Sequence, residues 1–264
     1  MERYDEWPPE TGFAQWQGTR ELQNDAVWIS PADSPAGIMM ALADGIGLDA
    51  AAGEAARAAV DAMRDEFEIS PAGEPLYQTV LRIAGGAHAR VRAMNEMLEQ
   101  QGELRTGATV ACAVVRSRQA SFSSVGNARV FLLRGGRLLQ LNRDHLLSLE
   151  AEERDILEGR APDLSPDWAL RVTAYAGIDG LKAPDWQQVP IALRADDQLI
   201  LMSSGMYGAL EEEELCEILT EAPPQQAAEE AVRRVQGRNQ ASQSNISLAV
   251  LRVSSRKRRA SRGA

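Results

Sequence analysis

The segment Ile38-Met39-Met40-Ala41-Leu42-Ala43-Asp44-Gly45 does most to decide how this chain folds. Its six consecutive apolar residues predict a strand that is covered on both faces. The strand ends in one acid followed by a glycine. Two later strand ends carry hydroxyls instead: Ser203-Ser204 follows the apolar run 200–202, and Ser244 precedes the strand expected at 245–253.

Apolar periodicity outward from this strand predicts an α+β fold. Helical spacing is found over 53–67, 76–101, 150–158, 211–219 and 225–236, although Gly85-Gly86 weakens the middle of the second helix. Further strands are expected at 13–17, 26–30, 109–116, 120–125, 128–133, 137–141, 170–175, 187–191 and 198–202. Four successive strands from 109 to 141 break the alternation that a doubly wound parallel sheet needs, so we expect two sheets covered by helices.

Composition narrows the class of protein. The chain has 264 residues, 44% of them apolar, and no apolar run approaches the ~20 residues that span a bilayer. The acidic N-terminus lacks the apolar core of a signal peptide, so we expect a cytoplasmic protein. The net charge is −10, which disfavours nucleic acid as a partner. Residues 254–264 carry only basic charges, and we expect them to form a disordered tail.

Several short motifs occur in a fixed order along the chain. They are Arg20-Glu21-Leu22-Gln23-Asn24-Asp25, Ala43-Asp44-Gly45-Ile46-Gly47, Gly126-Asn127-Ala128-Arg129, Ser203-Ser204-Gly205 and Ser244-Asn245-Ile246. Together they resemble the metal-dependent Ser/Thr protein phosphatases of the PPM, or type 2C, class, and the resemblance extends from about residue 11 to 253. It implies a single domain over 1–253 with a four-layered α-β-β-α sandwich, in which helix pairs flank two mainly antiparallel sheets.

The resemblance also implies a site. In the family, Asp44 would bridge two Mg²⁺ or Mn²⁺ ions, the Gly45 carbonyl would be a further ligand, and Arg20 would contact phosphate. Asp25 is a retained acid of the same site. Four other acidic positions of the family are replaced here, by Asn24, Asn127, Ser204 and Ser244.

The replacements predict that the metal site is degenerate. Two adjacent dications need several anionic ligands to offset their repulsion, and hydroxyl and amide oxygens are neutral, weak ligands. We therefore expect no intact set of catalytic residues and no metal at full occupancy. The leading interpretation is a pseudophosphatase, a regulatory module in Ser/Thr phosphorylation signalling that binds a phosphoprotein or a kinase.

Other interpretations remain open at this point. The chain could be a weak phosphatase whose metal ligands are Asp25, Asp44 and amide oxygens, or a scaffold that binds through its surface. Asp44-Gly45 could be only a turn, and Arg20 could pair with a local carboxylate. A dinucleotide loop at Gly45-x-Gly47 is disfavoured by the preceding acid and by the strands that follow.

Overall fold

The structure is a computed structural model that describes residues 9–71, 73–159, 171–181 and 183–254. In this part of the chain, one sheet has the order β1–β11–β10–β6–β7, and every neighbouring pair is antiparallel. Its strands are β1 (Pro9–Trp16), β11 (Ile246–Val253), β10 (Gln198–Met202), β6 (Arg129–Arg134) and β7 (Arg137–Gln140).

The other sheet is also antiparallel and has the order β2–β3–β4–β5–β8, with β9 also paired to β5. Its strands are β2 (Asp25–Ile29), β3 (Ile38–Ile46), β4 (Gly107–Arg116), β5 (Gln119–Val125), β8 (Asp185–Trp186) and β9 (Ile191–Ala192). The helices are α1 (Ala50–Glu68), α2 (Leu76–Gln100), α3 (Leu147–Leu157), α4 (Ser204–Tyr207), α5 (Glu212–Glu221) and α6 (Pro224–Gly237).

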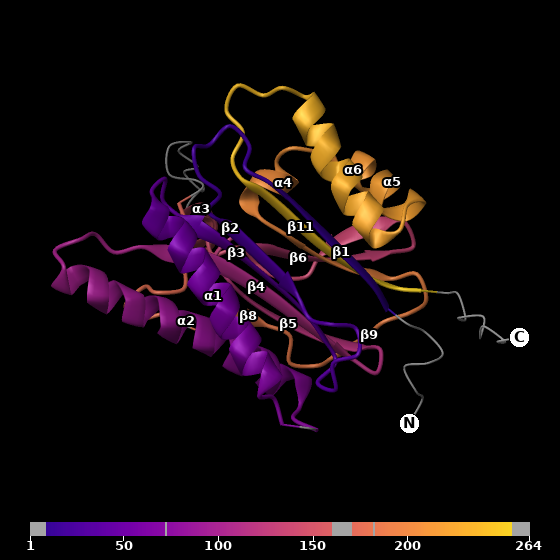
Figure 1. Ribbon diagram of the computed structural model, residues 1–264, viewed down its shortest axis with the longest axis horizontal. Coiled ribbons are helices and arrows are strands. Elements are labelled where there is room, and N and C mark those ends of the chain that lie inside the picture. The colour runs from indigo at the N-terminus through magenta and orange to yellow at the C-terminus, as the bar shows by residue number, and fades with distance from the viewer. Residues whose placement is uncertain (1–8, 72, 160–170, 182, 255–264) are drawn as a thin grey trace, which may run out of the picture.

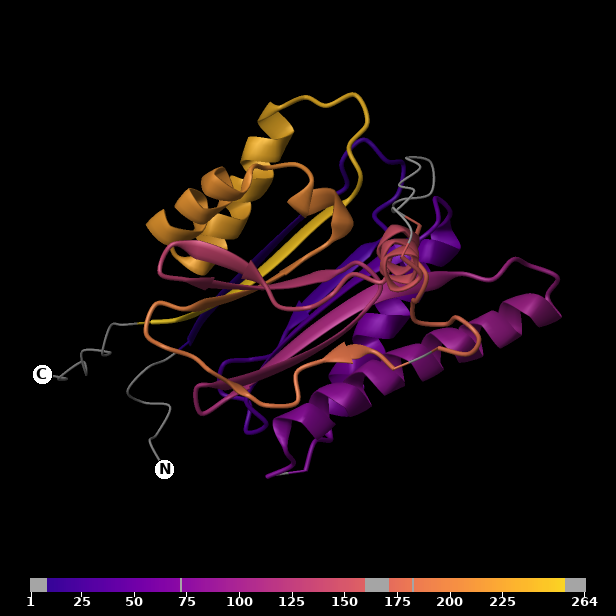
Figure 2. The same cartoon turned by 180° about the vertical axis from the view of Figure 1, so that it is seen from behind.

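The sheets form the two inner layers of a four-layered sandwich. Figure 1 shows α1 and α2 on one outer face and α5 and α6 on the other, and Figure 2 shows the same layers from behind. One apolar cluster lies between α1, α2 and the β3 sheet, a second between α5, α6 and the β11 sheet, and a third between the sheets. The expected α-β-β-α architecture is confirmed. No helix in the described ranges is both long and apolar enough to cross a bilayer.

Alternation along β3 decides where its terminal acid points. Met39 and Ala41 pack in the cluster under α1 and α2, whereas Met40 and Leu42 pack in the cluster between the sheets. Successive side chains of a strand point to opposite faces. Asp44 therefore continues the series that faces the other sheet, at the point where the apolar core ends.

The same alternation directs two further polar residues into this layer. On β2, Val27 packs against the cluster between the sheets, so Asp25 at the start of the strand shares its face. On β11, Ala249 packs in that cluster, so Ser247 faces the same way from the opposite sheet. Both sheets thus contribute polar side chains to one end of the sandwich.

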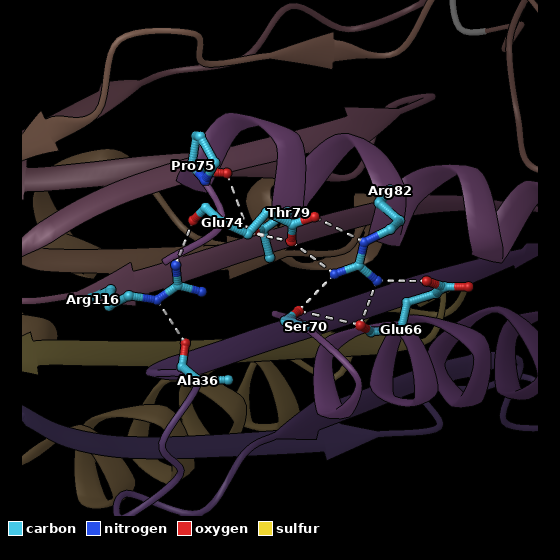
Figure 3. Close-up of polar contacts among 8 residues, drawn as sticks. All are labelled: Ala36, Glu66, Ser70, Glu74, Pro75, Thr79, Arg82 and Arg116. Carbon is cyan, nitrogen blue, oxygen red and sulfur yellow. Dashed lines mark hydrogen bonds and ion pairs between the residues drawn. The ribbon is translucent and has the colours of Figure 1, made fainter. Parts of the chain in front are cut away.

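A half-buried cluster of polar contacts fixes the α1–α2 hairpin at the far end of the sheet (Figure 3). The Arg82 guanidinium on α2 donates to the Glu66 carboxylate at 2.6 Å and to the Glu74 carboxylate at 2.9 Å. The Glu74 carbonyl accepts a 2.7 Å bond from Arg116 of β4. Gly86 continues α2 without interruption, and a Cβ there would lie 2.5 Å from Glu66 Cγ. The glycine that weakens helix propensity is thus where α1 and α2 approach most closely.

Two of the expected strands are wrong. Residues 171–175 belong to no strand, because Thr173 and Arg171 exchange backbone hydrogen bonds with the loop at His145 and Leu147. Residues 187–190 also lie outside the strands β8 and β9, and Pro190 has no N–H for a ladder. Of the basic tail expected at 254–264, only Ser254 lies among the described residues.

Candidate functional site

A cleft of about 530 Å³ opens at the polar end of the sandwich. It brings together most of the residues that the sequence motifs singled out. Its lining residues come from the β1–β2 loop, the end of β3 and the segment before β11: Thr19, Arg20, Glu21, Leu22, Asn24, Asp44, Gly45, Gly47, Leu48, Ser244 and Asn245. Asp25 and Ser204 lie beside it, in contact with the cleft floor.

Only glycine fits at position 45, because backbone atoms of two neighbouring segments lie against the end of β3. A Cβ at this position would lie 2.2 Å from the Ala52 carbonyl oxygen and 2.9 Å from the Asn24 carbonyl oxygen. The Gly45 N–H donates to the same Asn24 carbonyl at 2.9 Å. The glycine therefore lets the β1–β2 loop and the start of α1 close around the end of β3, which positions the residue before it, Asp44, on the cleft floor.

Two carboxylates lie side by side on this floor. Asp25 and Asp44 are directly opposite each other in the β2–β3 ladder. Burial is the main cause that raises the pKa of Asp25, to about 8, and the adjacent charge of Asp44 adds to it. Burial also raises the pKa of Asp44, against the opposing effect of hydrogen bonds from Ser204. Among the described residues, no group of three or more His, Cys, Asp or Glu is placed to hold a metal ion.

Serine hydroxyls from the other sheet meet these carboxylates. Ser204 Oγ, at the start of α4, donates a 2.7 Å hydrogen bond to Asp44 Oδ2. Ser247 Oγ, on β11, donates a 2.7 Å hydrogen bond to Asp25 Oδ2. Asp25 Oδ1 is buried and has no hydrogen-bond partner in the described part of the chain. One acceptor atom is thus left unsatisfied in an otherwise bonded cluster.

Asn24 acts as a donor where a carboxylate could not. Its Nδ2 donates 3.2 Å hydrogen bonds to the carbonyls of Gly47 and Asp49. Its backbone N–H donates to Asn245 Oδ1 at 2.8 Å. The amide therefore fastens the β3–α1 loop to the β1–β2 loop and to the start of β11. A glutamate at this position would place two acceptors against those carbonyls.

The cleft rim combines one cation, Arg20, and one acid, Glu21, with apolar side chains. Arg20 is exposed, and from the described residues no ion pair or hydrogen bond reaches its guanidinium. Leu22, Ile46 and Leu48 are exposed to 40%, 37% and 73% of their surface. Leu22 and Leu48 line the cleft beside Arg20. A local carboxylate partner for Arg20, which the sequence left possible, is not found in the described part of the chain.

Asn127 is not brought to the cleft lining. It lies in the turn between β5 and β6, where its carbonyl accepts a 3.2 Å hydrogen bond from the Tyr207 hydroxyl. The Arg129 guanidinium stacks 3.7 Å from the centre of the Tyr207 ring and also pairs with Asp144 at 2.7 Å. Asn127 and Arg129 therefore pack against α4 through Tyr207, and the charge of Arg129 is already paired with Asp144.

Three contributors to the site had no role assigned from the motifs, although Ser203 lies within the Ser203-Ser204-Gly205 motif. Ser247 and Ser203 face the carboxylates, and Leu48 forms the apolar rim. The signal for the serines is the alternation of β10 and β11, since each lies on the face that the apolar residues between the sheets occupy. No pattern in the sequence marks Leu48 as exposed.

Comparison with known proteins supports the fold. No protein-family model and no curated protein sequence matches this chain. Among solved structures, PppA, a key regulatory component of the T6SS in Pseudomonas aeruginosa, aligns with a TM-score of 0.75 and 23% identity over 92% of this chain and 97% of its own. The catalytic domain of the serine/threonine phosphatase PstP in complex with two manganese ions aligns with a TM-score of 0.72 and 22% identity, over 93% and 98%.

A third structure carries the name of the class. The PPM Ser-Thr phosphatase MsPP from Mycobacterium smegmatis aligns with a TM-score of 0.72 and 23% identity, over 92% of this chain and 97% of its own. Each alignment runs through both sheets and nearly the whole of both chains. This chain therefore has the fold of the PPM-type Ser/Thr protein phosphatases.

Proposed function

We propose that this protein is a cytoplasmic pseudophosphatase, a regulatory module that binds a phosphorylated segment of a partner protein in its cleft without hydrolysing it. The observation that carries the proposal is the hydrogen bond from Ser204 to Asp44 at 2.7 Å. A hydroxyl donor occupies the carboxylate oxygen on the side where the related fold would present a further acid.

The donor set does not fit two divalent cations. Within the described residues, Asp44 and Asp25 are the acids on the cleft floor, Glu21 is an exposed acid of the lining, and the neutral oxygens come from Asn24, Ser204, Ser244 and a glycine carbonyl. Two dications bring four positive charges, against at most two negative ones from the two carboxylates of the floor. Hard cations such as Mg²⁺ and Mn²⁺ favour carboxylate oxygens, so the neutral oxygens do not make up the difference. We derive no hydrolytic step through metal ions in this chain.

The cleft retains what an anionic segment needs. Arg20 is exposed at the rim and, within the described residues, is unpaired, so its guanidinium is available to a phosphate. Arginine binds phosphate through two parallel N–H donors. Leu22 and Leu48 beside it offer apolar surface to the residues that flank the phosphate. The expected ligand is a phosphoserine or phosphothreonine with apolar neighbours.

The likeness to PppA supports a regulatory role for the same fold. PppA is a regulatory component of the T6SS in its own organism. For this chain we propose only the same general role, that of a regulator that acts on a phosphorylated protein or its Ser/Thr kinase.

Binding of synthetic peptides tests this proposal. Fluorescence anisotropy with a phosphoserine peptide that has leucine on either side should show saturable binding, which the unphosphorylated peptide lacks. Arg20→Ala should weaken binding about 10-fold or more, because it removes charge-assisted hydrogen bonds. Arg137→Ala is the matched control, since Arg137 is an exposed arginine on β7 away from the cleft.

Two outcomes would overturn the proposal. If Arg20→Ala leaves the affinity for the phosphopeptide unchanged, the cleft is not the binding surface and the protein is a scaffold. If manganese supports turnover of a phosphate ester that Asp44→Ala abolishes, the chain is a weak metal-dependent phosphatase.

A further inference from the structure

Two short hydrogen bonds span the gap between the sheets at the cleft. One runs from Ser204, which follows β10, to Asp44 of β3, and the other runs from Ser247 of β11 to Asp25 of β2; both are 2.7 Å long. In each case the hydroxyl comes from the β11 sheet and the carboxylate from the β3 sheet. Between the sheets lies an apolar core, and further polar contacts join them through backbone carbonyls: Gln15 Nε2 donates to the Asp25 carbonyl at 3.4 Å, and Arg134 donates to the Ala192 carbonyl at 2.8 Å.

The surroundings of Ser247 fix the direction of its hydroxyl. Gln15 Nε2 donates to Ser247 Oγ at 3.0 Å, so the serine oxygen accepts one bond and its proton is free to be given to Asp25. Ser203 Oγ accepts the Ser247 N–H at 2.9 Å, and the Ser203 N–H returns a 3.0 Å bond to the Ser247 carbonyl. Ser247 is buried; its hydroxyl is bonded to Gln15 and Asp25, and its backbone is paired with Ser203.

We infer that these two hydroxyl–carboxylate bonds form a clamp that joins the sheets and takes the place of a metal bridge. A metal ion bound by Asp44 Oδ2 would compete with the proton that Ser204 donates to the same oxygen. Hydrogen bonds are stronger in a water-poor interior than in water, so the clamp stabilises the closed cleft without metal.

The clamp goes beyond the proposed binding function, because it concerns what holds the cleft together whatever the cleft binds. It makes the stability of this fold independent of divalent cations. It also explains how serine can stand at position 204 without leaving a buried carboxylate unpaired, a condition that would destabilise the fold.

Thermal unfolding of the full chain tests the clamp. The melting temperature of the wild-type protein should be the same within about 1 °C in millimolar Mn²⁺ and in EDTA, since an ion that does not bind the folded state cannot stabilise it. Ser204→Ala and Ser247→Ala should each lower the melting temperature by about 3–10 °C in both solutions.

Ser123→Ala is the matched control. Ser123, on β5, is as buried as Ser247, whereas Ser204 is half-buried; Ser123 Oγ has no hydrogen-bond partner within the described chain, so its replacement should change the melting temperature by about 1 °C or less. Ser204→Asp is the complementary variant. It should be less stable than wild type in EDTA, because it adds a third adjacent carboxylate, and it should recover at least part of the loss in Mn²⁺.

Two results would overturn the clamp. A rise of several degrees for the wild-type protein in Mn²⁺ over EDTA would show that an ion, and not the hydroxyls, joins the sheets. Melting temperatures of Ser204→Ala and Ser247→Ala equal to that of Ser123→Ala would show that the hydroxyls contribute nothing. Neither result depends on phosphopeptide binding, so a failure of the clamp is distinguishable from a failure of the proposed function.

Discussion

Asp25 and Asp44 are register partners on adjacent strands, and both side chains face the space between the two sheets. Burial is the main cause that raises both pKa values; the adjacent Asp44 adds to the rise of the pKa of Asp25, whereas hydrogen bonds from Ser204 and Asp25 oppose the rise of the pKa of Asp44. The partners that reach them from the opposite sheet are the hydroxyls of Ser247 and Ser204. The β3 sheet therefore contributes two acids to the cleft, and the β11 side contributes hydroxyls.

Restoring acids on that side should restore metal binding. The triple variant Asn24→Glu, Ser204→Asp and Ser244→Asp puts three carboxylates around Asp44, enough to offset most of the charge of two dications. Isothermal titration should then show saturable Mn²⁺ binding at micromolar to low millimolar concentration. The control is the same triple variant with Asp44→Asn added, which should show no saturable Mn²⁺ binding. Equal binding by both would mean that the ions do not occupy this cleft.

The apolar rim should contribute to peptide affinity. Leu48 is 73% exposed beside the cleft, so Leu48→Ser removes no core packing and should leave the melting temperature unchanged. Affinity for the leucine-flanked phosphopeptide should fall about 3–10-fold, because part of a leucine side chain is buried on binding. Val189→Ser, at a residue 71% exposed between β8 and β9, is the control. If both variants lose phosphopeptide affinity to the same extent, the apolar rim does not contribute to peptide binding.

The polar cluster of Figure 3 should stabilise the α1–α2 hairpin. Arg82→Met keeps the length of the side chain but removes its bonds to Glu66 and Glu74, and it should lower the free energy of unfolding by about 1–3 kcal/mol. Arg90→Met removes an exposed pair with Asp65 on the same helices and should cost less than about 0.5 kcal/mol. Urea denaturation measures both. Similar losses would mean that the cluster is no stronger than a surface ion pair.

Acid should destabilise the protein through its two histidines. His145 Nδ1 accepts the Gly126 N–H at 2.9 Å and His88 Nδ1 accepts the Gly177 N–H at 3.3 Å, so both must be neutral at that atom. Burial is the main cause that lowers the pKa of each below 6.5. The stability is fully present above the unfolded pKa of about 6.5 and is lost as pH falls through that value toward the folded pKa values.

The pH effect can be isolated with one variant. His145→Asn leaves an oxygen that can accept the Gly126 N–H but does not titrate. The free energy of unfolding of this variant should therefore fall less between pH 7.5 and 5.5 than that of the wild-type protein, as measured by urea denaturation. If the free energy of unfolding falls equally in the variant and the wild-type protein between these pH values, His145 is not responsible for the acid destabilisation.

The sequence predicts the framework well because its signals are local. The apolar run ending at Asp44, the helical periodicity of α1 and α2 and the Gly135-Gly136 turn each depend on neighbouring residues, and each is confirmed. The α4 turn was not predicted, because four residues give no periodicity. The strand expected at 170–175 fails because its backbone finds partners in a loop far along the chain.

The candidate site follows a similar division. Motif order brings Arg20, Asp44, Gly45 and Ser244 to one cleft, as expected, but leaves Asn127 outside its lining. Ser247 belongs to no motif. Its hydroxyl meets Asp25 only because β2 pairs with β3 and one sheet packs on the other. Local sequence patterns do not predict such contacts between segments that lie far apart in the chain.

The most direct test of the account is calorimetric titration of the wild-type protein with Mn²⁺, with Mg²⁺ as a second ion. In the described part of the chain, the floor carboxylates beside Asp44 do not offset the four positive charges of two dications, so we expect no saturable heat of binding up to millimolar concentration. Saturable binding of two Mn²⁺ per chain at micromolar to low millimolar concentration, lost in Asp44→Asn, would contradict it.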